Sequence, residues 1–302
     1  MLASKVISPA SKISSHKVRK LILGTAQFGM NYGVANRGGQ VSIEEVLRII
    51  EVAQRAGIRT LDTAQSYGTS EEIIGSCLGK LRHREFDVIT KVSDNSMSID
   101  QRVRECFEKT TVSPKVVLAH SAALFSDSSF QTAVGQFRSQ GRNIKIGVSL
   151  YGEKEIKQVM RARFPPEIVQ LPLNILDSSL YQSGVIDEIK LRNIEVHARS
   201  VFLQGLFYLS LREVSDQLPA AIPYLKYLAK ASKKSMLTIA ELSLLWVTSL
   251  ESVDRVLVGV DNCTQLLSHL KTLEKEVDPE SYARALSLEC ENETVLNPSL
   301  WK

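Results

Sequence analysis

Short apolar runs rich in β-branched residues alternate along the chain with longer amphipathic stretches. Runs of this kind, bounded by turn residues, are typical of buried strands, whereas apolar residues three and four positions apart indicate helices. The pattern predicts eight strands, at residues 20–25, 58–63, 86–91, 115–120, 143–149, 167–171, 194–200 and 253–259.

The helical pattern is clearest in "SIEEVLRIIEVAQRAG", residues 42–57, where the apolar positions recur along one face. Ser42 followed by Glu45 is a capping signal at the start of a helix. Gly57 is a stop signal, because glycine readily takes the left-handed conformation that ends many helices. We therefore predict one helix between Ser42 and Gly57.

Eight strands, mostly followed by helices, favour parallel pairing with right-handed crossovers. The stretch from Leu21 to Lys275 is close to the ~250 residues typical of a (β/α)8 barrel. An open doubly wound sheet is the alternative, and a glycine-rich G-x-G-x-x-G after the first strand would favour it. Because "LGTAQFGMNYG" does not fit that pattern, we predict a single-domain α/β protein, a (β/α)8 TIM barrel, over residues 21–302 with residues 1–20 as an N-terminal tail.

Polar residues stand at the carboxyl ends of six predicted strands, four of them at equal intervals along the chain. They are Asp62, Lys91, His120, Ser149, Gln170 and Arg199. In a barrel these strand ends converge on one face, and that face carries the chemistry. The pattern therefore predicts one cavity surrounded by all six side chains.

The chemistry that this set suits is proton transfer at a carbonyl. Tyr67 follows Asp62 closely in the sequence, and a lysine ammonium beside a tyrosine favours its phenolate form. A carboxylate would hold the lysine, and His120 could orient a carbonyl oxygen or help to pass the proton. No metal is required, and the cysteines and histidines show no metal-ligand spacing. A lyase or aldolase that uses Lys91 as a Schiff-base nucleophile is a second possibility.

Three motifs now indicate a family. "LDTAQSYGTSEEIIG" around Tyr67, "VITKV" around Lys91 and "LAHS" around His120 resemble, in order, those of the aldo-keto reductases, and the resemblance covers nearly all of the chain from Leu21. It implies a tetrad in which Tyr67 is the general acid/base, Lys91 and Asp62 tune it, and His120 orients the carbonyl. The chain also resembles a branch whose members sit near bacterial surface-polysaccharide genes.

The resemblance further implies a bound nicotinamide cofactor, either NADP(H) or NAD(H). Its site would comprise Gly24, Thr25, Ser149, Gln170, Arg199, Ser200, Gly205, Gly259, Val260, Asp261, Asn262 and Gln265. Leu150 stands where the family usually has asparagine, and Arg199 stands where a tyrosine commonly stacks on the nicotinamide. A guanidinium plane can also stack on a ring. Asp261 and Asn262 occupy the place of the usual basic residue for a 2′-phosphate, which leaves the choice of cofactor open.

Phe28, Met30 and Tyr32 follow the first predicted strand, in "QFGMNYG". In a barrel they would overhang the catalytic mouth, where they either line a substrate pocket or pack. The expected substrate is a small carbonyl compound, an aldehyde or ketone, with a sugar derivative suggested by the resemblance alone. A nicotinamide-binding barrel that acts as a regulatory or sensor subunit with little turnover is the alternative.

Composition limits which partners and which cellular compartment are expected. The net charge of +4 comes without a basic run interleaved with aromatics, so nucleic-acid binding is not predicted. No apolar run reaches the ~18 residues of a membrane span. The four cysteines have no paired spacing, which predicts a reducing, cytoplasmic environment. The first 20 residues are rich in Ser and Lys without an acid, as in transit peptides, although a flexible tail is favoured. The oligomeric state is left open.

Overall fold

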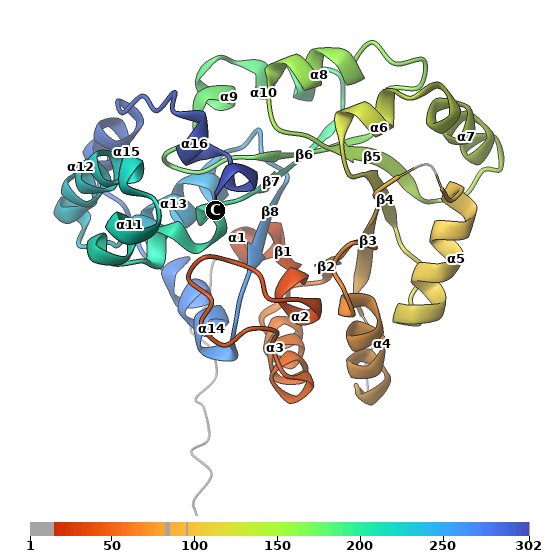
Figure 1. The fold of residues 1–302 in the computed structure, drawn as a ribbon, viewed down its shortest axis with the longest axis horizontal. Coiled ribbons are helices and arrows are strands. Elements are labelled where there is room, and N and C mark those ends of the chain that lie inside the picture. The colour runs from red at the N-terminus through yellow and green to blue at the C-terminus, as the bar shows by residue number, and fades with distance from the viewer. Residues whose placement is uncertain (1–14, 82–84, 95, 302) are drawn as a thin grey trace, which may run out of the picture.

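The computed structural model describes residues 15–81, 85–94 and 96–301, and its eight parallel strands close into a barrel in the order of the sequence (Figure 1). The strands are β1 (Leu21–Gly24), β2 (Thr60–Asp62), β3 (Asp87–Val92), β4 (Val116–Ala119), β5 (Lys145–Ser149), β6 (Ile168–Pro172), β7 (Glu195–Arg199) and β8 (Arg255–Gly259). Each of them overlaps the segment that the apolar runs predicted.

Closure of the barrel is visible at β1, which pairs with β2 on one side and with β8 on the other. Leu23 lies opposite Leu61 in one pairing and opposite Val258 in the other. The predicted (β/α)8 barrel is therefore confirmed. The open doubly wound sheet is excluded, because an open sheet has two edge strands with a partner on one side only, whereas every strand here has two neighbours.

Helices surround the barrel and connect its strands (Figure 1). The α-helices are α1 (Ser15–Lys20), α2 (Ala26–Gly29), α3 (Ile43–Ala56), α4 (Ser70–Lys80), α5 (Ile99–Thr110), α6 (Ala122–Ser126), α7 (Ser128–Ser139), α8 (Glu153–Val159), α9 (Ser179–Gln182), α10 (Val185–Leu191), α11 (Leu211–Gln217), α12 (Ile222–Ser232), α13 (Ile239–Ser249), α14 (Cys263–Thr272), α15 (Pro279–Leu286) and α16 (Glu293–Leu296). Short 3-10 helices are η1 (Leu203–Tyr208), η2 (Pro219–Ala221), η3 (Lys233–Ser235) and η4 (Pro298–Leu300).

The predicted helix after residue 42 is α3, and both of its end signals are confirmed. The Ser42 side chain accepts a hydrogen bond from the Glu45 amide, which satisfies one of the free amides of the first turn. Gly57 ends the helix with φ of 94°, in the left-handed region that costs glycine little.

The core has two layers. The larger layer lies between the barrel and its helices, where the apolar faces of both are buried. A smaller layer fills the inside of the barrel, with Ile22, Ile89, Val116, Leu118, Ile168 and Leu257. The barrel is therefore packed with side chains rather than open.

Both ends of the described chain are packed against the rest of the protein. Residues 1–14 of the expected tail lie outside the described residues, whereas its last six residues form α1, where Val18 is buried and Lys20 Nζ donates to the Leu250 carbonyl at 2.7 Å. At the other end Val295 is buried and the Trp301 indole donates to the Thr294 carbonyl at 2.9 Å.

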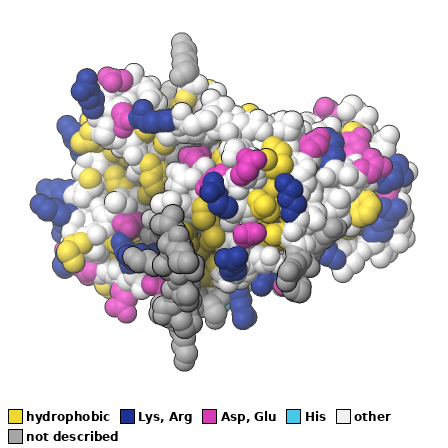
Figure 2. Space-filling model, turned by 90° about the horizontal axis from the view of Figure 1, so that it is seen from below, with side chains coloured by type: hydrophobic (Ala, Val, Ile, Leu, Met, Phe, Trp, Pro, Cys, Tyr) yellow, Lys and Arg dark blue, Asp and Glu magenta, His cyan; other side chains and the backbone are white. Residues whose placement is uncertain are grey.

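The surface mixes charges of both signs. On the face shown in Figure 2, basic and acidic side chains are interspersed with hydrophobic ones. Among the described residues, no helix is both long and apolar enough to cross a membrane.

Close packing between α4 and α5 can be tested at one glycine. A Cβ at Gly75 would lie 1.9 Å from the Lys109 carbonyl oxygen, so Gly75→Ala forces two helix backbones apart. We expect it to lower the free energy of unfolding by about 2 kcal/mol, within the range for overpacking. Thermal or urea unfolding measures this.

Gly79→Ala, on the same helix, is the matched control, because a Cβ there meets nothing within 4 Å. It should leave stability unchanged or raise it by up to ~1 kcal/mol through better helix propensity. Equal effects of the two substitutions would contradict the packing between α4 and α5.

Candidate active site

A cavity of about 310 Å³ lies at the carboxyl ends of the strands. Most residues that the sequence pointed to line it: Gly24, Thr25, Tyr32, Asp62, Tyr67, His120, Ser149, Gln170, Arg199, Ser200, Gly205, Gly259, Asp261 and Gln265. The convergence expected from a barrel is therefore present, and five of the six polar residues at the predicted strand ends face one space.

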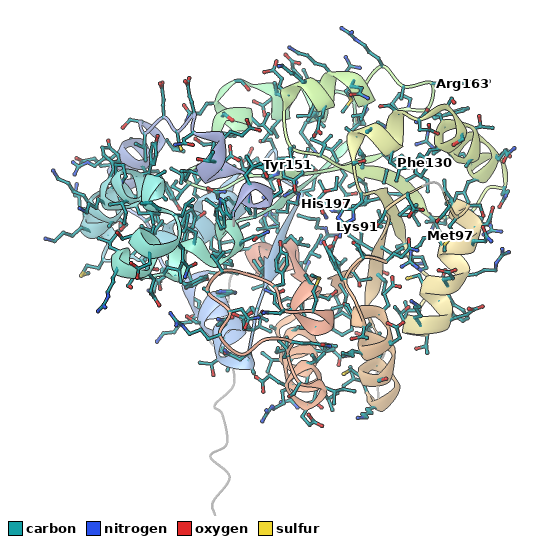
Figure 3. The ribbon with its side chains drawn as sticks, in the orientation of Figure 1. Lys91, Met97, Phe130, Tyr151, Arg163 and His197 are labelled. Carbon is teal, nitrogen blue, oxygen red and sulfur yellow. The ribbon has the colours of Figure 1, made fainter. Side chains whose placement is uncertain are left out.

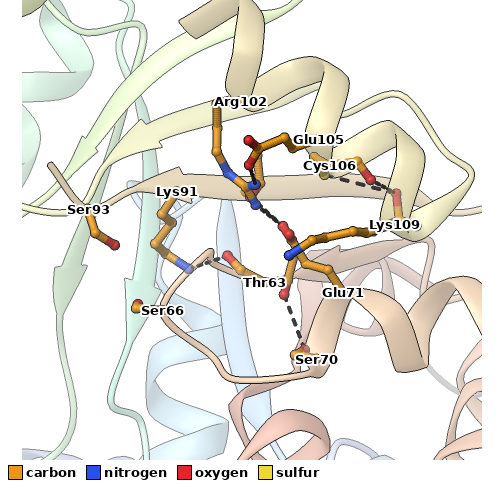
Figure 4. Close-up of polar contacts among 12 residues, drawn as sticks. Thr63, Ser66, Ser70, Glu71, Lys91, Ser93, Arg102, Glu105, Cys106 and Lys109 are labelled. Carbon is orange, nitrogen blue, oxygen red and sulfur yellow. Dashed lines mark hydrogen bonds and ion pairs between the residues drawn. The ribbon is translucent and has the colours of Figure 1, made fainter. Parts of the chain in front are cut away.

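Lys91, the sixth, lies beneath the cavity on β3 and is fully buried near the middle of the barrel (Figure 3). Its Nζ is bonded to the Asp62 carboxylate, donates to the Thr63 carbonyl at 3.0 Å, and lies 3.4 Å from the Tyr67 hydroxyl (Figure 4 shows the Thr63 bond). The ammonium thus joins the end of β2 to the tyrosine loop that follows it.

The charge on Lys91 is maintained in spite of its burial. Removal from water lowers the pKa of a lysine, but the Asp62 carboxylate and the Tyr67 hydroxyl together outweigh this effect and raise the pKa of Lys91. Lys91 is therefore an ammonium at neutral pH.

His120 follows β4 and stands beside Tyr67, with 6.0 Å between the ring centroids and an edge-to-face angle of 76°. The Ser66 and Ser93 hydroxyls lie 3.3 and 3.5 Å from its Nδ1. Burial, and then the positive charge of Lys91, lower the pKa of His120 to about 4. The imidazole is accordingly neutral at physiological pH.

Ser149 and Gln170 end neighbouring strands and lie opposite each other in the register of β5 and β6. The Gln170 side-chain amide donates to the second Asp62 carboxylate oxygen at 2.8 Å, so it is tied to the buried ion pair. Leu150, which replaces the usual asparagine, is fully buried in the core and does not line the cavity.

Arg199 ends β7, and its guanidinium lies over the Tyr151 ring, 4.2 Å from the centroid. It donates to the Ser200 hydroxyl and to the Leu150 carbonyl, each at 3.1 Å. Its Nε is buried without a hydrogen-bond partner among the described residues. The sequence suggested that this guanidinium could stack on a nicotinamide ring, and the ring that it contacts in the structure is Tyr151 of the protein itself.

The loop between β8 and α14 forms another wall. The Asp261 amide donates to Gln265 Oε1 at 2.7 Å, and Gln265 Nε2 donates back to Asp261 Oδ2 at 3.3 Å. Burial raises the pKa of Asp261. Two predicted cofactor residues do not line the cavity: Asn262 caps α14 by accepting from the Gln265 amide, and Val260 is buried in the core.

Three of the predicted cofactor residues lie where β1 meets its neighbours. Gly24 and Gly259 are partners in the pairing of β1 with β8, and a Cβ at Gly259 would come within 2.7 Å of the Gln27 side chain. Thr25 donates its hydroxyl to the Asp62 carbonyl at 2.9 Å. All three residues line the cavity.

The aromatic segment after β1 divides its side chains between two environments. Tyr32 lines the cavity, as predicted. Phe28 is fully buried in the core, and Met30 is exposed outside the cavity. Phe28 therefore has the packing role that the sequence left open.

The cavity is also lined by residues to which no sequence motif pointed: Gln27, Asn36, Tyr151, Phe202, Gln204 and Tyr208. The Tyr208 hydroxyl lies 2.8 Å from His269 Nε2, and the Phe202 ring stacks on that histidine at 4.7 Å. The aromatic-rich stretch "VFLQGLFY" is the only local signal for this wall. Its backbone is irregular, with positive φ at Leu203, Gln204 and Gly205.

Behind the cavity, a buried ion pair connects α4 and α5 to β3. Arg102 and Glu71, both labelled in Figure 4, are almost fully buried. Arg102 also donates to the Thr90 hydroxyl at 2.7 Å. Thr90 immediately precedes Lys91, so this pair holds the strand segment that carries the lysine.

A dinucleotide fits the donors and acceptors of this cavity. Buried polar atoms normally have partners, yet Arg199 Nε and Asp261 Oδ1 have none among the described residues and belong to side chains that line the wall. A polar ligand would supply them. Among the described residues, no group of three or more His, Cys, Asp or Glu is placed to hold a metal ion.

This fold and this cavity define a barrel enzyme with an acid–base cluster at the carboxyl ends of its strands. The sequence model described as "Aldo/keto reductase family" matches residues 20–289. The chain belongs to this family, and it is an NAD(P)-dependent oxidoreductase that acts on a small carbonyl compound.

Solved structures share the fold. An aldo-keto reductase from Bacillus halodurans in its holo form aligns with a TM-score of 0.70 and 18% identity over 90% of this chain and 93% of that one. A thermostable aldo-keto reductase in complex with the inhibitor epalrestat gives 0.66 and 20% identity, covering 89% and 94%. A glycerol dehydrogenase from Gluconobacter oxydans gives 0.66 and 18%, covering 89% and 90%.

One curated relative is similar over a short stretch. Versiconal hemiacetal acetate reductase from Aspergillus parasiticus is 47% identical over 70 residues, which is 22% of this chain. The match spans about a fifth of that protein, 19% of its length.

The lowered pKa of His120 gives a test of the site in the folded protein. We expect its imidazole, followed by NMR and assigned with a His120→Gln variant, to show no titration between pH 5 and 8. Because the unfolded chain takes up this proton near pH 6.5 and the folded chain near 4, stability should fall as pH drops through that range. The variant should lose less stability there. A midpoint near 6.5 for His120 would show that the site is open to water.

Proposed function

We propose that the protein interconverts a carbonyl compound and its alcohol, with Tyr67 giving and taking the proton. One observation carries this proposal: the Lys91 ammonium, kept charged by Asp62, lies 3.4 Å from the Tyr67 hydroxyl. A positive charge at that distance stabilises the phenolate that remains when Tyr67 protonates the carbonyl oxygen. In the reverse reaction the phenolate takes the proton from the alcohol.

His120 would orient the carbonyl. With Nδ1 facing the hydroxyls of Ser66 and Ser93, a neutral imidazole that accepts from them carries its proton on Nε2. That N–H can donate to the carbonyl oxygen beside Tyr67. A neutral donor fixes the direction of the carbonyl and leaves the proton transfer to Tyr67.

A nicotinamide supplies or accepts the hydride when it is bound. Ser149 and Gln170 are the residues that would hold its carboxamide, because their side chains lie together at the ends of β5 and β6. Gln170 also holds Asp62, so the group that would position the ring is joined to the group that holds Lys91. Arg199 and Asp261 offer their unpartnered atoms along the same cavity.

The Schiff-base alternative is disfavoured by the state of Lys91. A nucleophilic lysine must lose its proton and reach the substrate. Lys91 is fully buried, paired with Asp62 and raised in pKa, so it is neither neutral nor exposed to the cavity.

We further infer that the substrate is a small aldehyde or ketone, with sugar derivatives the first class to screen. The local likeness to a versiconal hemiacetal acetate reductase supports reduction as the reaction. The four cysteines are free, which agrees with the reducing cytoplasm that we propose as its compartment. No nucleic-acid partner is proposed.

Tyr67→Phe should leave cofactor affinity unchanged and lower kcat by at least ~10²-fold, because it removes only the exchangeable proton. Steady-state kinetics and a fluorescence titration measure the two quantities. Tyr227→Phe is the control, since Tyr227 lies outside the cavity with its hydroxyl on Ser287. Full activity of Tyr67→Phe would refute the acid–base role. Tight cofactor binding without turnover on any carbonyl in the panel would favour the regulatory alternative.

Borohydride added during turnover should leave no substrate attached to Lys91, as judged by intact-mass spectrometry and peptide mapping. The reason is that a charged, buried ammonium forms no imine. A mass adduct on Lys91 would replace the proposed mechanism with Schiff-base chemistry.

A further inference from the structure

We propose that the cavity selects a dinucleotide whose adenosine ribose has a free 2′-hydroxyl, so that the enzyme uses NAD(H) in preference to NADP(H). This inference rests on the proposed function, which places the nicotinamide beside Tyr67. From there the cavity continues past Gly24 and Gly259 to Asp261 and Gln265. The far half of an extended dinucleotide therefore reaches the loop before α14.

Asp261 offers an acceptor to that half. Oδ2 accepts from Gln265 at 3.3 Å and the Gln27 side chain lies beside the carboxylate, whereas no hydrogen bond of good geometry reaches the buried Oδ1 among the described residues. A ribose hydroxyl is a donor that satisfies a carboxylate oxygen, and acidic residues hold ribose diols in this way in dinucleotide-binding proteins. A phosphate has only acceptor oxygens and carries negative charge. It would therefore give Asp261 Oδ1 no hydrogen bond and would repel the carboxylate.

The start of α14 would otherwise be a place for a phosphate. Amides at a helix N-terminus point outward and favour anions. Here they are already used: the Cys263 amide donates to the Glu45 carboxylate at 2.6 Å, and the Gln265 amide donates to Asn262 at 2.9 Å. A second carboxylate, Glu45, thus takes the position that an added phosphate would need.

Cations of the cavity wall do not offset the charge of Asp261. Arg199 is the single lysine or arginine among the described residues that line the cavity, and its bonds go to Ser200 and Leu150 on the β7 side. Glu45 forms an ion pair with Arg48, and neither of these two side chains lines the cavity. A 2′-phosphate at this end would face Asp261 without a free positive charge among the described lining residues.

Isothermal titration of the full chain with NADH and NADPH, at matched ionic strength, tests the inference. We expect NADH to bind at least ~10-fold more tightly, which corresponds to ~1.4 kcal/mol. Asp261→Asn and Glu45→Gln each remove one charge and keep an oxygen acceptor. Each should tighten NADPH binding by ~3-fold or more while NADH affinity changes less, and the double variant should bring the two dissociation constants close together.

Glu289→Gln is the matched control, because it removes one negative charge from an exposed position outside the cavity. It should leave the ratio unchanged. NADPH binding as tight as NADH binding in the unmodified protein would overturn the inference and leave the proposed oxidoreductase function intact. If neither NADH nor NADPH binds although the circular dichroism spectrum shows a folded protein, both the cofactor preference and the proposed oxidoreductase function are overturned. If Asp261→Asn, Glu45→Gln and Glu289→Gln all raise NADPH affinity equally, the net charge of the protein explains the effect, and the proposed role of the Asp261 region is overturned.

Discussion

An ammonium and a carboxylate lie in contact, out of water, at the base of the cavity, and the surrounding barrel keeps them there. Transfer of two such charges from water costs several kcal/mol for each ion, and only good geometry with additional hydrogen bonds offsets that cost. Lys91 and Asp62 meet this requirement with groups from separate parts of the chain: Gln170 donates to the carboxylate, and the Thr63 carbonyl and the Tyr67 hydroxyl receive the ammonium. The closed barrel brings these groups to one place.

The tyrosine loop depends on a second set of buried contacts. Ser70, at the start of α4, donates to Thr25 and receives from Thr63, which joins the ends of β1 and β2 to the helix that follows Tyr67. The ion pair of Glu71 with Arg102 fixes the same helix to α5 and, through Thr90, to β3. The distance between Tyr67 and Lys91 therefore depends on the packing of helices that never touch a substrate.

Charge is distributed unevenly along the cavity. At the catalytic end, Lys91 and Asp62 neutralise each other and His120 is neutral, so a carbonyl meets donors without a large net field. Arg199 adds one positive charge on the β7 side, while Asp261 makes the α14 side acidic. A dinucleotide, which has hydroxyls on its adenosine ribose at one end, would match this distribution of charge.

The sequence by itself determined the barrel and the strand-end residues of the candidate site. Apolar runs at regular intervals specify eight buried strands, and parallel strands in a barrel direct their carboxyl ends to one face. The positions of Asp62, Lys91 and His120 at strand ends therefore predict that these three residues lie together. The tertiary structure alone decided which of Phe28 and Tyr32 faces the cavity, because that choice depends on the path of an irregular loop. It also decided that Arg199 lies on Tyr151 and that Glu45 reaches the Cys263 amide. These contacts join segments whose meeting is set by the packing of whole helices, and no local pattern of side chains encodes it.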